Sequence, residues 1–175
     1  MDYISSWTMV DGTAVTFRPI RPEDEPAMVE FHKTLSEQSV HLRFFFLDCL
    51  DARVAHERLV RQCFIDYENE MALVAECIDP QTGRLEILCV GRLKRQLCPT
   101  DGELAVIVSD KYQGRGVGTE MVRRLVALAC RERFRRIIAL ILSENAPMLA
   151  LARRLHFAVA RGEDPLSLMA TLDLN

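Results

Sequence analysis

Apolar residues follow the two-residue period of strands in some segments and the three- to four-residue period of amphipathic helices in others. Strands are predicted over 13–20, 71–78, 85–93, 104–108, 137–142 and 166–172. Two of these, 104–108 and 137–142, are apolar without a break, which predicts strands buried on both faces. Helices are predicted over 22–35, 52–64, 117–131 and 145–155, and residues 40–47 form an aromatic-rich cluster.

The order of these segments predicts one mixed α/β domain spanning residues 1–175. Two helices separate the first strand from the second, and no internal repeat or linker interrupts the chain. Residues 79–83 join the second and third strands and have the residue types of a hairpin turn.

Composition supports a compact protein, because 49% hydrophobic and 27% charged residues exclude a disordered chain. No apolar run approaches the roughly 20 residues that cross a bilayer, and the N-terminus lacks the pattern of a secretory signal. We therefore expect a cytoplasmic protein without a membrane partner. The six cysteines include no CxxC pair, which predicts reduced and mostly buried thiols. The four histidines lack metal-ligand spacing, so no metal is predicted.

The formal net charge of -3 conceals an asymmetry. From Lys111 to Arg161 there are eleven basic and three acidic residues, so this segment carries +8 and the remainder carries -11. A basic segment within an acidic protein suggests a local anionic ligand rather than a nucleic-acid surface, which requires a broadly basic domain. An arginine-rich, solvated helix face is the alternative interpretation.

Three glycines in five residues lie between the fourth predicted strand and the next helix. Gly114, Gly116 and Gly118 let the backbone approach a ligand closely, and the N–H groups at the helix start favour a phosphate. A tight turn without a ligand also explains these glycines. A P-loop does not fit, because Thr119 follows Gly118 and no lysine is present. The dinucleotide fingerprint also fails, because Thr119 replaces its last glycine.

The sequence QGRGVG at residues 113–118 resembles the Q-x-x-G-x-G loop that holds the pyrophosphate of acetyl-CoA in GNAT-superfamily N-acetyltransferases. A second segment, IIALILSENAPMLALARRLHF, is similar to the next strand and helix of that superfamily, with Asn145 at its usual asparagine. On these motifs the chain is identified as a member of the superfamily. The resemblance implies the GNAT fold, with a central, mostly antiparallel mixed sheet of about six to seven strands and four helices.

A narrower resemblance covers nearly the whole chain. The segments FRPIRPEDEPAMVEFHKTLSEQSVHLRFF, FIDYENEMALVA, GELAVIVSDKYQGRGVGTEMVRRL and LSENAPMLALARRLHF look like the acetyltransferase domain of the Pat family of protein lysine acetyltransferases, which modify acyl-CoA synthetases. This implies an acetyl-CoA-dependent enzyme with a protein substrate.

The resemblance also assigns roles to single residues. Glu103 matches the glutamate that acts as general base in Pat-like domains, although a solvent-facing glutamate at a strand end is the plain alternative. The residues implied to bind acetyl-CoA are Val106, Ile107 and Val108 through their backbone, the loop residues Gln113, Gly114, Arg115, Gly116, Val117, Gly118 and Thr119, and Asn145.

Two positions depart from the superfamily pattern. Ala152 stands where many relatives have a tyrosine that protonates the leaving thiolate, and His156 replaces a glycine. A thiol with a pKa near 8.5 is a tolerable leaving group without help, and His156 is either a substitute acid or an incidental helix-end residue. The arginines Arg123, Arg124, Arg153 and Arg154 are candidates for the 3′-phosphate of CoA, with a solvated helix surface as the alternative.

The sequence thus predicts an N-acetyltransferase that transfers acetyl from acetyl-CoA to an amine by direct attack within a ternary complex. The predicted acceptor is a protein lysine, such as that of an acyl-CoA synthetase. A small-molecule amine acetyltransferase and a catalytically silent acyl-CoA-sensing module are the alternatives, and the oligomeric state stays open. The candidate acceptor groove contains Asp66, Tyr67, Glu68 and Glu70.

Overall fold

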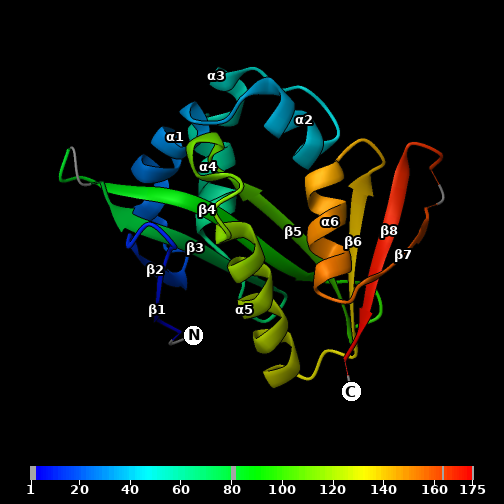
Figure 1. Ribbon diagram of the computed structural model, residues 1–175. Helices are drawn as coiled ribbons and strands as arrows, with labels where there is room; N and C mark the ends of the chain where they lie inside the picture. Colours follow the sequence, from blue (N-terminus) through cyan, green and yellow to red (C-terminus); the bar gives the residue numbers. More distant parts are fainter. Residues whose placement is uncertain (1–2, 80–81, 163, 175) are drawn as a thin grey trace.

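The computed structural model describes residues 3–79, 82–162 and 164–174. One sheet has the strand order β1-β2-β3-β4-β5-β6-β8-β7 (Figure 1). Its strands are β1 (Ser5–Thr8), β2 (Ala14–Pro19), β3 (Glu70–Ile78), β4 (Leu85–Arg95), β5 (Asp101–Val108), β6 (Arg136–Leu142), β7 (Ala158–Arg161) and β8 (Ser167–Asp173). The helices are α1 (Glu25–Lys33), α2 (Glu37–Phe44), α3 (Leu50–Arg53), α4 (His56–Cys63), α5 (Val117–Arg131) and α6 (Ala146–Arg154), with 3-10 turns η1 (Pro22–Asp24) and η2 (Asp110–Tyr112).

Neighbouring strands are antiparallel except for β5 and β6, which run parallel. A mixed α/β fold with a mostly antiparallel sheet is therefore confirmed. The predicted hairpin joins β3 to β4, which pair from Ile78 and Leu85 onward. Within its turn, Gly83 has a φ of +65° and its N–H donates to the Asp79 carbonyl at 2.8 Å, while Pro80 and Gln81 lie outside the described residues.

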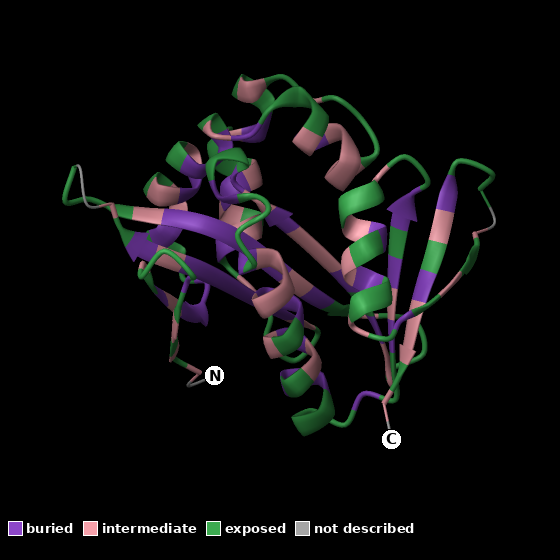
Figure 2. Ribbon diagram, in the orientation of Figure 1, coloured by how far each residue is buried: buried purple, intermediate pink, exposed green. Residues whose placement is uncertain are grey.

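Helices pack on both faces of the sheet and bury two hydrophobic cores, and Figure 2 shows the central strands buried along most of their length. Leu125 of α5 is fully buried in the first core, which α6 also covers. Phe31 of α1 and Leu59 of α4 belong to the second core. Successive residues of β3 serve both, because Leu73 faces the first core and Val74 the second.

The approximate numbers of strands and helices expected from sequence differ from the observed ones, since the described residues form eight strands and six α-helices. β1 and β7 have four residues each, too few to display a two-residue period. The single helix predicted over 52–64 is two helices, because the chain breaks between α3 and α4 at Val54 and Ala55. Part of the aromatic segment belongs to α2, whose N-cap Ser36 accepts a hydrogen bond from the Ser39 N–H.

Two further expectations concerned burial. β5 is not buried on both faces, because Ala105, Val106 and Val108 are only half-buried, and Leu140 of β6 is 49% exposed. All six cysteines are free, but only half of them are buried rather than most. Among the described segments, no helix combines the length and apolar character needed to span a membrane.

Candidate functional site

The glycine loop between η2 and α5 has a backbone that requires glycine. Gly114 and Gly116 adopt φ values of +72° and +90°, in the left-handed region that side-chain-bearing residues rarely enter. Gly118 lies inside the first turn of α5, where a Cβ atom would come within 3.2 Å of the Val108 side chain. The three glycines therefore shape the loop and bring it close to β5.

The loop ends in the exposed start of a long helix. Gly116 is the N-cap residue of α5, which has 15 residues, and no side chain caps this end. The first N–H groups of a helix have no partner within the helix, and together with the helix dipole they favour an anion. The sequence prediction of a phosphate site at this loop is thus compatible with the observed backbone.

The sheet opens between β5 and β6 beside this loop. These strands pair only at Asp101–Arg136, Gly102–Ile137 and Glu103–Ile138, and beyond that point they diverge (Figure 1). In the part of the chain that the structure describes, the remaining length of β5 has no strand partner on this side. The Val108 carbonyl accepts a hydrogen bond from the Gln113 amide at 3.2 Å, and the other backbone groups on this side are available to a ligand that lies along β5 like an added strand.

A pocket of about 380 Å³ fills this opening. It is lined by β5, by the glycine loop, and by α6 residues that include Met148 and Leu151. This explains the half-buried side chains of Val106 and Val108, because the face predicted to be covered by protein borders the pocket instead.

α2 supplies a wall of the pocket that the sequence analysis did not identify. Ser39, Leu42 and Arg43 line it, and the Ser39 hydroxyl donates to Asp110 at 2.7 Å while accepting from the Gln113 amide at 2.9 Å. The cap signal at Ser36 was the available indication of this helix. Its position across the pocket was not visible in any local pattern.

Glu103 lies at the last paired position of β5, where the two strands begin to diverge. Its side chain is exposed, and one carboxylate oxygen accepts a hydrogen bond from the Gln96 amide at 2.7 Å. Glu103 lines a second pocket of about 320 Å³ together with Arg43, Phe44 and Phe45. The two pockets share the lining residues Leu42, Arg43, Val106, Asn145 and Met148.

Most of the predicted cofactor residues line the first pocket, with two exceptions. Arg115 points elsewhere and pairs with Asp11 at 3.4 Å, and Val117 is fully buried in the core. The predicted residues that line the pocket are Val106, Ile107, Val108, Gln113, Gly114, Gly116, Gly118, Thr119 and Asn145.

Asn145 has a structural task that can be described directly. It is the N-cap of α6, and its side-chain oxygen accepts a hydrogen bond from the Met148 N–H at 3.1 Å. The residue thereby fixes the start of the helix that forms one wall of both pockets. Any contact to a ligand would add to this capping role.

No residue of α6 carries a hydroxyl that would replace the missing tyrosine. Ala152 is buried in the core, and His156 lies beyond the end of α6 with a φ of +66°, exposed and outside both pockets. The left-handed backbone accounts for the glycine that relatives carry at this position. Tyr112 lines the first pocket, but its hydroxyl donates to Glu86 at 2.8 Å, and burial raises its pKa.

The predicted arginine set is dispersed. Arg154 lines the first pocket, whereas Arg124 of α5 contacts Tyr3, Ser5 and Glu120 and lines neither pocket. Arg123 is exposed and pairs with Glu120 at 3.7 Å. Arg153 is exposed outside both pockets.

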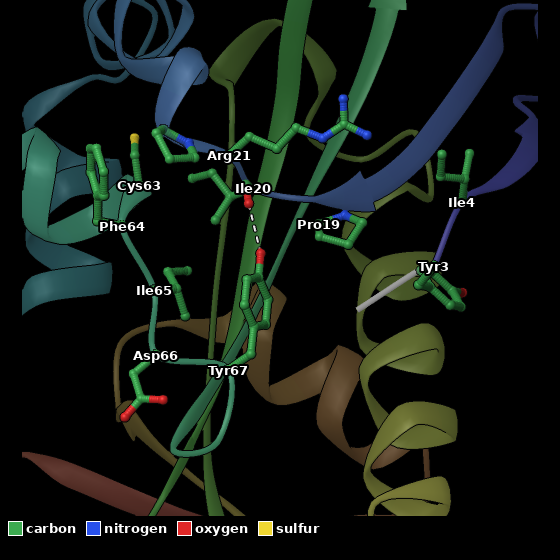
Figure 3. A pocket seen from close by; sticks show the side chains of 11 residues that line it. Tyr3, Ile4, Pro19, Ile20, Arg21, Cys63, Phe64, Ile65, Asp66 and Tyr67 are labelled. Carbon is green, nitrogen blue, oxygen red and sulfur yellow. Dashed lines mark hydrogen bonds between the residues drawn. The ribbon is translucent and has the colours of Figure 1, made fainter.

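The predicted acceptor groove is also divided. Glu70 lies opposite Lys94, which lies opposite Glu103, so Glu70 and Glu103 share one face of the sheet. Asp66 and Tyr67 instead line a separate pocket, where the Tyr67 hydroxyl donates to the Ile20 carbonyl at 2.6 Å (Figure 3). The structure therefore does not gather all four groove residues around Glu103. Within the described segments, no group of three His, Cys, Asp or Glu residues is placed to hold a metal.

Comparisons with known proteins agree with this geometry. Residues 14–158 match the model of the acetyltransferase (GNAT) domain family. The chain is 32% identical over 157 residues to acetyltransferase PA5475 of Pseudomonas aeruginosa, which covers 88% of this chain and 80% of that protein.

Solved structures share the fold. The GNAT domain of S. lividans PAT superposes with a TM-score of 0.84 at 24% identity, over 99% of this chain and 100% of that one. The PaiA N-acetyltransferase from Thermoplasma acidophilum, solved in complex with coenzyme A, gives a TM-score of 0.70 at 11% identity, over 91% and 99% of the two chains. With its glycine loop, its divergent β5 and β6 and the family match over most of its length, this chain belongs to the GNAT acetyltransferase family.

Proposed function

We propose that this protein is a cytoplasmic N-acetyltransferase that moves the acetyl group of acetyl-CoA to a protein lysine, such as that of an acyl-CoA synthetase. The observation that carries the proposal is the meeting of two pockets at Val106. One pocket borders the glycine loop and the other contains Glu103. A donor in the first and an amine in the second would meet at this shared wall.

The donor would be held mainly by main-chain groups. The N–H groups at the start of α5 suit the pyrophosphate, and the free edge of β5 suits the pantetheine arm. An N–H of β5 near Val106 would polarise the thioester carbonyl. The likeness to the PaiA enzyme, which was solved with coenzyme A, supports this placement.

Glu103 would provide the base. A lysine amine has a pKa near 10.4, so only about one amine in 2,500 is neutral at pH 7. Glu103 would take the amine proton, directly or through a water, while the new N–C bond forms and the C–S bond breaks. The departing thiolate of CoA would take a proton from solvent, since Ala152 offers none. General-base help of this kind is typically worth roughly 10² to 10⁴ in rate.

A protein acceptor is supported by the surface around Glu103. Phe45 lines its pocket and is 40% exposed, and the next two residues, Phe46 and Leu47, are 53% and 62% exposed. Exposed apolar side chains grouped at the mouth of a pocket favour contact with a large partner rather than with a small polar amine. The sequence likeness to Pat-type domains points the same way.

The test is acetylation of a purified acyl-CoA synthetase with acetyl-CoA, read as acetyl-lysine by mass spectrometry. We expect Glu103→Gln to lower the rate by roughly 10² to 10⁴ with acetyl-CoA affinity retained. Glu57→Gln is the matched control and should leave the rate unchanged, because Glu57 is exposed on α4 and lines neither pocket.

Two outcomes would favour the alternatives. Consumption of a small amine without acetyl-lysine would identify a small-molecule acetyltransferase. Acetyl-CoA binding without CoA release to any amine, in both wild type and Glu103→Gln, would identify a sensing module, which the absence of a hydroxyl at Ala152 makes worth testing.

A further inference from the structure

The side chain of Arg43 lies at the junction of the two pockets. Arg43 lies in the last turn of α2 and lines both pockets, and it is only partly exposed. Its guanidinium lies 4.8 Å from the centre of the Phe44 ring. Among the described residues, no hydrogen bond or ion pair satisfies it. The other half-buried arginine nearby, Arg92, pairs with Glu70 at 2.5 Å.

The charges around Arg43 come from three adjacent strands. Glu70 of β3 is engaged by Arg92 of β4, and Glu103 of β5 accepts from Gln96. Burial lowers the pKa of Arg43 to about 10, with Arg92 adding to this effect and Glu103 and Glu70 opposing it. At neutral pH the guanidinium is therefore a charged, partly buried group whose nearby carboxylates, Glu70 and Glu103, are already bonded to other side chains.

We propose that Arg43 forms a carboxylate-binding subsite beside Glu103. Its ligand is a carboxylate carried by the acceptor amine, such as an acidic residue next to the target lysine, or by the acyl group of the donor. The proposal rests on the proposed function, in that the Glu103 pocket is the place of transfer.

The chemistry of guanidinium favours this ligand. Its N–H groups form a planar fork that matches a carboxylate in a bidentate pair. A partly desolvated charge without a hydrogen-bonded counter-charge is unfavourable, so a bound carboxylate would stabilise the Arg43 guanidinium where a neutral group would not. Arg43 lines both pockets, and a carboxylate on either substrate would therefore reach it.

The experiment compares substrates that differ only in that carboxylate. One arm uses lysine peptides with Asp or Asn beside the lysine, together with β-alanine and β-alaninamide as small amines. The other arm uses succinyl-CoA and butyryl-CoA as donors with one acceptor. Each is measured with wild type, with Arg43→Gln, and with Arg61→Gln as the control, because Arg61 is exposed on α4 and lines neither pocket.

In at least one arm we expect wild type to favour the carboxylate substrate by about ten- to a hundredfold in kcat/KM. Arg43→Gln should bring this ratio close to one, and Arg61→Gln should keep it. The arm that responds identifies the source of the carboxylate. Equal use of all matched pairs by wild type, or a preference that survives in Arg43→Gln, would overturn the subsite.

The experiment distinguishes a wrong subsite proposal from a wrong proposed function. Acylation of small amines but of no peptide would remove the lysine acceptor, while the β-alanine comparison would still test Arg43. If no amine is acylated, the wild-type affinities for the donors succinyl-CoA and butyryl-CoA and for the peptides decide. Equal affinities for these two donors, together with equal affinities for the Asp and Asn peptides, would then overturn the subsite.

Discussion

The Nε2 atom of His41 in α2 lies 3.0 Å from a carboxylate oxygen of Glu144, which is close to the start of α6. This contact crosses the opening between β5 and β6. On its other side, α2 is fastened to the glycine-loop region by the hydrogen bond from Ser39 to Asp110. α2 therefore spans the first pocket and is bonded at both flanks.

Breaking this link should loosen the pocket wall. We expect Glu144→Gln to weaken acetyl-CoA binding by no more than severalfold, because both side chains are substantially exposed. Affinity can be followed by the fluorescence of Trp7, the sole tryptophan, whose ring would lie 3.5 Å from a Cβ atom at Gly116. A double-mutant cycle with His41→Ala provides the control, and additive effects of the two changes would contradict a functional link.

The glycine loop permits a comparison between two similar glycines. Gly114 and Gly83 have φ values of +72° and +65°, and a Cβ atom at either would meet nothing within 4 Å. Alanine at either position should cost roughly 1–2 kcal/mol of stability through backbone strain. Only Gly114→Ala should also weaken acetyl-CoA binding, because Gly114 lines the pocket. Denaturant unfolding and Trp7 titrations measure the two effects, and equal affinities in both variants would argue against the loop as the phosphate site.

Gln96 is expected to orient the base. Its amide donates to Glu103 at 2.7 Å, so Gln96→Leu should lower kcat by about tenfold and leave the KM for acetyl-CoA unchanged. Gln38→Leu is the control, since Gln38 is exposed and lines neither pocket. Steady-state kinetics at saturating acceptor separate the two parameters. An unchanged kcat in Gln96→Leu would mean that Glu103 needs no such support.

Stability should depend on pH through His32. This side chain is 2% exposed, and neither ring nitrogen has a hydrogen-bond partner in the described segments. Burial lowers its pKa from 6.5 to about 4, although the nearby Gln62 amide opposes part of the shift. The unfolded chain therefore binds a proton more readily, and the contribution of neutral His32 is complete above pH 6.5 and declines as the pH falls towards 4.

Between pH 7 and pH 5 this group should cost about 2 kcal/mol of unfolding free energy. His32→Leu should lack that component. On acidification the unfolding free energy of the variant should therefore rise by about 2 kcal/mol relative to that of wild type. Urea unfolding at both pH values measures it. Parallel losses in wild type and variant would show that His32 is protonated as easily in the folded state as in the unfolded one.

Local patterns predicted much of the fold. The alternation in β2 and the spacing in α5 both came from residues that repeat on one face, because burial selects apolar side chains at that period. Gly114 and Gly116 were also identified locally, since a left-handed backbone favours glycine whatever surrounds it. Short β1 and β7 were missed because four residues carry too little periodicity.

The sequence by itself thus determined the class of fold and the glycine loop. It placed Glu103 just before the strand expected over 104–108, whereas β5 begins at Asp101 and contains Glu103. Only the tertiary structure showed that the pairing of β5 with β6 ends at Glu103. No pattern within either strand indicates this, because the divergence of two strands depends on what packs between them. The tertiary structure also decided that α2 spans that opening and brings Arg43 to the same pocket as Glu103. These residues are 60 positions apart in sequence, and only the way the helices pack on the sheet makes them neighbours.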